Sequence, residues 1–147
     1  MTGPPTAAAW RGFDGVLAGL LVVGVGTMFL PWASSGQTSR NSIELMRSAD
    51  RLDLLDGWMA SVGLGVWLAM PFVAAAAVVA LTLGHRLLGT ALGAVVAVTL
   101  VAGVWAVKAA PLRADGGMTV ALIVGVLTMA FTLGGYFYAT RDSTSDP

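Results

Sequence analysis

The chain has 147 residues, eight basic and eight acidic side chains, and no cysteine. The lack of cysteine excludes disulfides, thiolate nucleophiles and sites in which Cys binds zinc or an iron–sulfur cluster. Zero net charge argues against nucleic acid as a partner. The hydrophobic fraction of 56% is typical of membrane proteins, and the connections are too short to bury a core of their own. We therefore expect residues 1–147 to form a single integral membrane domain.

Long stretches without any charged side chain dominate the sequence. They are apolar on every side, whereas a helix at the surface of a soluble protein is apolar on one side only. About 20 such residues cross a hydrocarbon core of ~30 Å. We predict an all-α fold, a four-helix transmembrane bundle with a short amphipathic helix in the loop after the first span. The expected spans are about 13–32, 57–83, 87–107 and 116–140, and the expected polar loop is 33–56.

The first expected span begins near Phe13 and ends at Pro31 and Trp32. Its apolar region is longer than that of a secretory signal and lacks a small-residue cleavage site, so we interpret it as a retained span. Trp10 and Trp32 flank it, as amphipathic rings do at the headgroup level.

Asp14 is the ionisable residue nearest to the interior of a span. One interpretation is an acid near a helix N-terminus, stabilised by the helix dipole and by Arg11 three residues earlier. The other is a proton- or cation-coupling carboxylate, because small four-span multidrug exporters carry an acid in their first helix. We favour the first interpretation, since those exporters place the acid deeper in the membrane.

The polar loop opens with a Ser- and Gly-rich run typical of loops. Asn41 and Glu44 then form the pattern of a capping box, which predicts that a helix starts there. Leu45 and Leu52 recur at helical spacing, opposite charged residues. We favour packing of this helix on the rim of the bundle, and the alternatives are a partner-binding helix and adsorption to lipid. The candidate partner surface consists of Arg40, Glu44, Leu45, Arg47, Arg51 and Leu52.

Several short patterns in this region carry a resemblance to a known group of proteins. They are Phe29-Leu30-Pro31-Trp32, the Ser/Gly run, Arg40, Ser42-Ile43-Glu44-Leu45 and Leu54-Leu55-Asp56-Gly57. With the four-span pattern, they resemble small uncharacterised four-pass bacterial membrane proteins. The resemblance implies this topology, but no activity, ligand or catalytic residue.

Pro71 lies near the middle of the second span, where it removes a backbone hydrogen bond and is expected to kink the helix. Gly84, His85 and Arg86 predict a very tight turn between the second and third spans. Such a short connection makes these spans antiparallel neighbours.

Two pairs of glycines have the spacing that lets membrane helices approach closely. These candidate helix-packing residues are Gly15, Gly19, Gly89 and Gly93. We favour packing between the four helices of one chain, and the alternative is association with another copy or another membrane protein.

The sequence offers little for catalysis or metal binding. His85 is the only histidine and has no nearby acidic residue, so we expect no metal site and no cofactor. The last three spans contain no Asp, Glu, Lys, Arg, Asn or Gln well inside, although proton relays and ion pathways need such groups. This argues against an intramembrane enzyme and against an ion-coupled transporter.

We therefore expect a non-enzymatic accessory or scaffolding subunit of a larger membrane assembly. The alternative is a small oligomeric transporter or pore that uses Asp14 and the Pro71 kink. The expected partners are membrane lipid and either another membrane protein or a second copy of the chain, and the expected location is a bacterial inner membrane.

Four spans place both termini on the same side of the cell membrane. Counting basic residues in the short loops would place the opposite side in the cytoplasm. We nevertheless favour cytoplasmic termini, because Arg11 and Arg86 lie close to span ends whereas the basic residues of the 33–56 loop alternate with acids.

Overall fold

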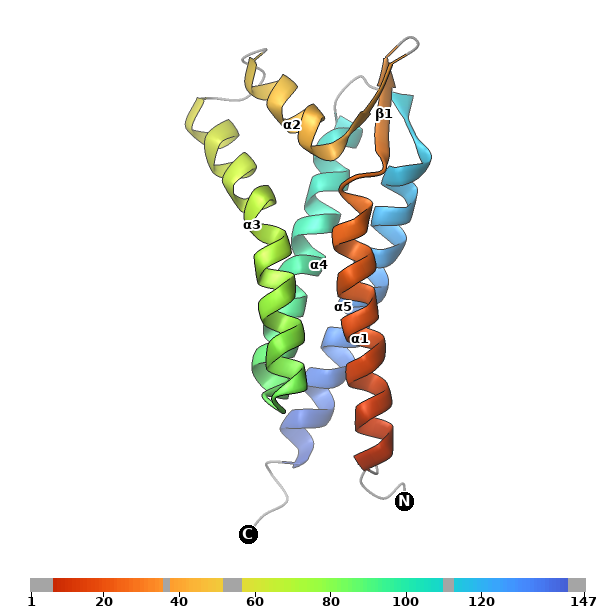
Figure 1. Cartoon of the computed structure of the whole chain (residues 1–147), viewed down its shortest axis with the longest axis vertical. Helices are drawn as coiled ribbons and strands as arrows, with labels where there is room; N and C mark the ends of the chain where they lie inside the picture. Colours follow the sequence, from red (N-terminus) through yellow and green to blue (C-terminus); the bar gives the residue numbers. More distant parts are fainter. Residues whose placement is uncertain (1–6, 36–37, 52–56, 110–112, 143–147) are drawn as a thin grey trace.

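Four long helices run side by side, and a small cap of one helix and three strands covers one end of them (Figure 1). The computed structural model describes residues 7–35, 38–51, 57–109 and 113–142. In chain order the elements are α1 (Ala7–Thr27), β1 (Pro31–Ser35), β2 (Thr38–Asn41), α2 (Ser42–Arg51), α3 (Gly57–Thr82), α4 (Arg86–Ala109), β3 (Arg113–Ala114) and α5 (Gly116–Asp142).

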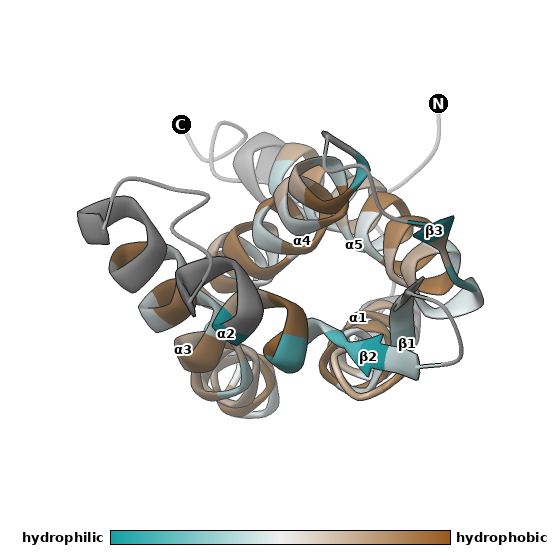
Figure 2. Cartoon of the chain, turned by 90° about the horizontal axis from the view of Figure 1, so that it is seen from above, coloured by the Kyte–Doolittle hydropathy of each residue, from teal (hydrophilic) through white to brown (hydrophobic). Residues whose placement is uncertain are grey.

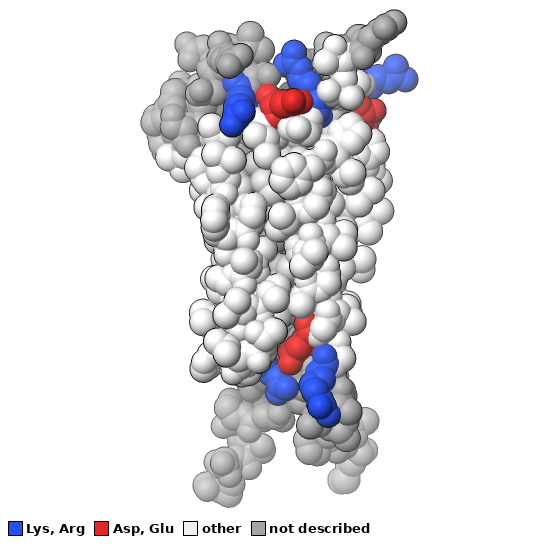
Figure 3. All heavy atoms as spheres, in the orientation of Figure 1, with Lys and Arg blue, Asp and Glu red and all other residues white. Residues whose placement is uncertain are grey.

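Within the described part of the chain, three helices are long and apolar enough to cross a membrane: Val62–Thr82, Arg86–Lys108 and Gly116–Phe137. Figure 3 shows the same property on the surface, where a belt without charged side chains separates two charged ends. The polar residues seen from above gather on the cap, at β2, β3 and part of α2 (Figure 2). A mostly helical fold with helices able to span a membrane is therefore confirmed.

The helices pack in an order that follows the chain. α3 lies against α4, α4 against α5, and α1 against both α3 and α5. The core between them mixes large and small side chains, because helices in lipid associate through close packing rather than through the hydrophobic effect. Its members include Leu17, Leu21, Ala74, Ala77, Val96, Leu100, Val104 and Ala121.

The expected tight turn between the second and third spans is confirmed. α3 ends at Thr82 and α4 begins at Arg86, and Gly84 between them has a φ of 82°. This left-handed backbone conformation strains residues that carry a Cβ, which explains the glycine. α3 is helical throughout and includes Pro71.

The first long helix ends earlier than predicted. α1 stops at Thr27, whereas the expected span continued to residue 32. Turn hydrogen bonds follow, and Pro31 then starts a strand. Apolar side chains continue to Trp32, so a prediction based on apolar residues alone put the end of the first helix too late in the sequence. Trp32 is only 1% exposed, so it is a core residue and not the membrane-interface ring expected from its position.

The cap contains a three-stranded antiparallel sheet with the order β2-β1-β3. Ser34 of β1 lies opposite Ser39 of β2 and opposite Arg113 of β3. The fold is therefore not all-α: the prediction of a plain loop for the Ser- and Gly-rich run was wrong. Short strands without apolar alternation leave no periodic signal in the sequence.

The helix predicted in the polar loop is present as α2. The backbone N–H of Glu44 donates to Oδ1 of Asn41 at 2.9 Å, and the backbone N–H of Asn41 donates to Oε2 of Glu44 at 3.2 Å. This reciprocal pair is a capping box, as predicted. Ile43, Leu45 and Met46 are half-buried and pack against the core.

A set of buried hydrogen bonds, which we call the cap joint, ties the cap to the bundle. The Ser42 hydroxyl donates to the Met28 carbonyl at 2.7 Å and accepts from the Trp67 indole N–H at 3.1 Å. The Trp32 indole N–H donates to the Thr27 carbonyl at 2.7 Å. The rings of Trp32 and Trp67 meet edge to face, with centroids 5.3 Å apart. The cap joint therefore connects the end of α1, the start of α2 and the middle of α3.

Replacing Ser42 with alanine should destabilise the fold. The change removes two hydrogen bonds and leaves the Trp67 indole N–H without its acceptor, which costs about 1–3 kcal/mol. The free energy of unfolding in mixed detergent micelles measures this loss. The control is Thr82→Ala, because the exposed Thr82 hydroxyl bonds only within its own helix. An equal loss in both variants would contradict a special role for the cap joint.

Two adjacent glycines at the start of α5 make a second test. A Cβ on Gly117 would collide with the backbone of Pro31 and with Leu30, whereas a Cβ on Gly116 would meet nothing within 4 Å. Gly117→Ala should lower the free energy of unfolding by about 1–3 kcal/mol, because the backbone of β1 cannot yield easily. Gly116→Ala should change it by less than about 0.5 kcal/mol. Equal values would show that β1 does not press on α5.

Candidate functional site

Asp14 forms an ion pair with a residue far away in the sequence. Its Oδ2 lies 3.2 Å from Nε of Arg86, which starts α4. The side chain of Asp14 is 18% exposed and that of Arg86 is 38% exposed. Because α1 begins at Ala7, Asp14 lies about two helical turns in, beyond the reach of most of the dipole effect. The pairing expected with Arg11 is therefore replaced by a pairing between α1 and α4.

An aromatic and hydroxyl layer lies beside this pair. The rings of Phe13 and Phe131 are 5.5 Å apart, and the Thr90 hydroxyl donates to the Arg86 carbonyl at 2.9 Å. The Oδ1 atom of Asp14 is buried and, within the described part of the chain, has no hydrogen-bond partner. The arrangement neutralises one carboxylate oxygen with an arginine and shields the other from water.

The sequence contained a usable signal for this pair. Topology alone puts the start of the first span and the turn between the second and third spans at the same membrane edge. Asp14 and Arg86 lie at those two places, 72 residues apart. Local spacing instead favoured Arg11, because three residues along a helix bring side chains together.

The buried polar side chains of the described residues are all hydroxyls: Thr27, Ser42, Thr90, Thr128 and Thr132. Each donates a hydrogen bond to a backbone carbonyl between 2.7 and 2.9 Å away. Hydroxyls bonded in this way are satisfied and carry no charge. Among the described residues, no group of three or more His, Cys, Asp or Glu side chains could hold a metal ion.

The four candidate packing glycines divide into two kinds. A Cβ on Gly89 would lie 2.6 Å from Cγ of Leu81 on α3, and a Cβ on Gly93 would lie 3.1 Å from Cγ2 of Thr132 on α5. Both therefore lie at close approaches between helices of one chain. A Cβ on Gly15 or Gly19 would meet nothing within 4 Å, and both residues are exposed. The packing within the chain that we favoured is not found for these two.

Gly15 and Gly19 belong to a larger surface that we call the open face of α1. Gly12 and Gly26 are also exposed and also have open space where a Cβ would lie. Val22 lies between them and is 65% exposed. The face is thus apolar, with glycines interspersed among exposed valines, and not covered by another part of the described chain.

The candidate partner surface of the polar loop is partly used inside the molecule. Leu45 is half-buried against the core, whereas Arg40, Glu44 and Arg47 are exposed on the cap. The side chain of Arg51 and the whole of Leu52 lie outside the described residues. The part of this surface that faces outward is therefore charged.

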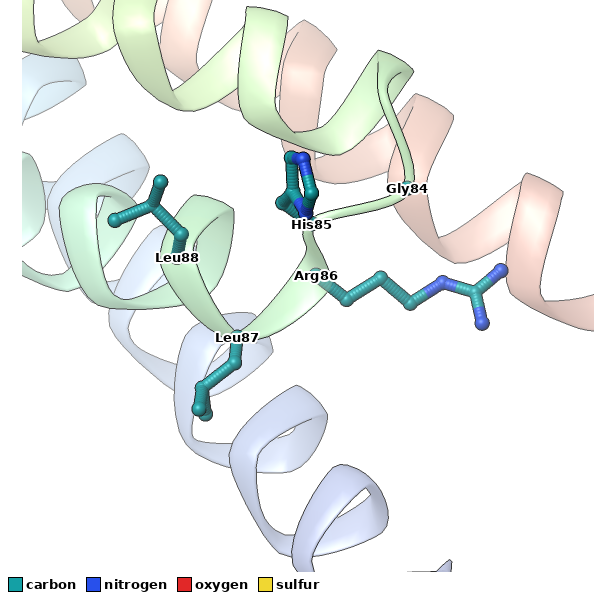
Figure 4. Close-up of a pocket in the computed structure, with 5 residues that line it drawn as sticks. All are labelled: Gly84, His85, Arg86, Leu87 and Leu88. Carbon is teal, nitrogen blue, oxygen red and sulfur yellow. The ribbon is translucent and has the colours of Figure 1, made fainter.

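His85 lies where the sequence placed it, in the turn between α3 and α4. It is exposed and lines a shallow pocket with Gly84, Arg86, Leu87 and Leu88 (Figure 4). In the same view the Arg86 side chain extends toward α1. The pocket thus lies next to the Asp14–Arg86 pair.

Comparisons with known proteins give no family: no family model, no curated protein and no solved structure matches this chain. The resemblance to small four-pass bacterial membrane proteins stays a prediction.

The ion pair predicts a specific pattern in a double-mutant cycle. Arg86→Gln alone should destabilise the chain, because it leaves a mostly buried carboxylate without its partner. Adding Asp14→Asn removes that carboxylate charge and should recover part of the loss, with a coupling energy of about 0.5–3 kcal/mol. Free energies of unfolding in detergent measure each corner of the cycle. Strictly additive effects would mean that the two side chains do not interact.

Proposed function

We propose that the chain crosses the membrane four times and that α1 is the fourth span. α1 has 21 residues, which gives a length of about 31 Å at 1.5 Å per residue. It lies among the three apolar helices and packs against α3 and α5. The start of α1 and the end of α5 lie at the same end of the bundle, as an even number of spans requires (Figure 1).

In that membrane the protein acts as a non-enzymatic accessory or scaffolding subunit. The observation that carries this proposal is the contrast between interior and surface. The described interior holds hydroxyls and indole N–H groups that are all hydrogen-bonded, and one carboxylate that is paired with an arginine. Proton transfer and ion passage need ionisable or solvated groups inside the bundle. The features that could serve a function are therefore on the outer surface of the bundle, where they would contact other molecules.

Two outer surfaces suit contacts with another membrane protein. The open face of α1 offers a helix backbone that a neighbouring helix can approach closely, as small residues allow. The cap offers the charged side chains of Arg40, Glu44 and Arg47 to a partner outside the membrane. A second copy of the chain is the other candidate partner for the face of α1.

The alternative function is a small oligomeric transporter or pore. The specific observation that favours it is the Oδ1 atom of Asp14, which is buried without a hydrogen-bond partner in the described chain. In this function Asp14 would exchange its bond to Arg86 for a transported cation or proton, and α3 would bend at Pro71.

We place the protein in a bacterial inner membrane with both termini in the cytoplasm. Arg11 and Arg86 then lie at the cytoplasmic edge, where basic residues concentrate. The cap would lie on the opposite side of the membrane.

Single cysteines test the lateral contact, because the chain has no cysteine of its own. Gly15→Cys or Gly19→Cys, treated in native membranes with a short thiol- and amine-reactive crosslinker, should give one discrete larger product. The matched control is Val98→Cys on α4, which is 53% exposed. Mass spectrometry of the product identifies another protein or a second copy. Equal crosslinking from Val98 would refute a contact specific to α1.

Asp14→Asn separates the two functions. An accessory subunit should still form the same crosslinked product, because Asp14 is not on the open face. A coupled transporter should lose substrate transport in membrane vesicles, because its exchangeable carboxylate is gone. Loss of transport together with unchanged crosslinking would favour the alternative function.

A further inference from the structure

The turn between α3 and α4 combines apolar and basic side chains at the edge of the apolar belt. We propose that this turn binds the headgroup of an anionic phospholipid, whose acyl chains lie along the exposed leucines beside it. This inference does not depend on the accessory role, since a transporter could carry the same site.

Exposed leucines form the apolar half of the site. Leu83 is 68% exposed, Leu87 is 58% exposed and Leu88 is 54% exposed. They lie within six residues of one another, at the last residues before and the first residues after the turn. In a membrane this position is level with the upper parts of the acyl chains, just inside the headgroups.

Basic side chains form the other half. His85 is exposed in the pocket, and Arg86 lines the same pocket (Figure 4). Arg11 is exposed and lies one helical turn from Asp14, the partner of Arg86. Figure 3 shows basic and acidic side chains together at this end of the belt.

The balance of charge selects an anionic ligand. Among the residues whose side chains the structure describes, Arg11 and Arg86 are the positive ones at this end and Asp14 is the negative one. Without His85, the net charge of these three side chains is therefore +1. Asp14 holds Nε of Arg86 at 3.2 Å, so the guanidinium group is already ordered before a ligand arrives. Less ordering on binding means that less affinity is lost.

The leucines select a lipid rather than a dissolved anion. A free phosphate would contact only the polar groups of the turn. A phospholipid would in addition cover the exposed leucines with its acyl chains. The two ligands share the same headgroup chemistry, so the experiment must separate them.

Native mass spectrometry of the purified full-length chain provides the test. The chain is mixed with equal amounts of dioleoyl phosphatidylglycerol and dioleoyl phosphatidylcholine, which differ only in headgroup. The wild-type chain should retain the anionic lipid about fivefold better, as expected for one basic charge near the headgroups. Equal retention of the two lipids would overturn the proposal.

Variants locate the site without breaking the Asp14–Arg86 pair. The double change Arg11→Gln and His85→Ala should abolish the preference, and both residues are exposed, so the fold should survive. Arg113→Gln is the matched control, since Arg113 is exposed on β3 in the cap at the other end.

Three results would overturn the assignment. The first is a preference that survives the double change, and the second is a preference that Arg113→Gln removes just as well. The third is loss of the anionic lipid on adding inorganic phosphate at the concentration of the lipid. That loss would show that the site binds a dissolved anion as tightly as it binds the lipid, so that the acyl chains add nothing.

Discussion

A polar group surrounded by hydrocarbon has no water to bond, so it must find its partner inside the chain. The end of α1 shows how this constraint organises the molecule. The carbonyls of Thr27 and Met28 lie where α1 ends and lack the N–H donors that a continuing helix would supply four residues later, and the side chains of Trp32 and Ser42 donate to them instead. The donor from Trp67 then fills the remaining capacity of the Ser42 hydroxyl. The cap is thus built around the unsatisfied carbonyls of one helix end.

The same constraint explains the composition of the interior. Each buried threonine bonds to a carbonyl of its own helix, so apart from the Asp14–Arg86 pair and the cap joint the contacts between helices depend on shape. Shape in turn depends on small residues: Gly89 admits Leu81, and Gly117 admits the backbone of β1. Close packing of this kind replaces the hydrophobic effect, which is missing between helices in lipid.

Much of the fold could be predicted from the sequence, because a span leaves a strong signal. The charge-free stretches predicted the positions of α3, α4 and α5. The residue types at Gly84 predicted the turn, and the spacing of Asn41 and Glu44 predicted the capping box. The strands could not be predicted, since β1 and β2 pair through backbone groups that no residue pattern reveals. The end of α1 was placed too late, because apolar residues continue through the turn into β1.

The candidate site was predicted only in part. Asp14 was found because a carboxylate in an apolar segment is conspicuous, but its partner Arg86 lies 72 residues away. Gly15 and Gly89 have the same spacing to a second glycine, yet one faces outward and the other packs inside. Sequence spacing identifies a helix face made of small residues. Only the arrangement of the helices decides what that face contacts.

The ion pair between α1 and α4 also constrains the order in which the chain can assemble. Ribosomes deliver Asp14 long before Arg86, so in the four-span arrangement that we propose the first helix enters the bilayer before its partner on α4 has been made. We expect the Asp14 carboxylate to stay near the aqueous boundary until the α3–α4 hairpin arrives, because a charge is costly deeper in the bilayer. In this arrangement we expect the first helix to make its final contacts only after the α3–α4 hairpin is made, so that the last step of insertion is also a step of tertiary folding.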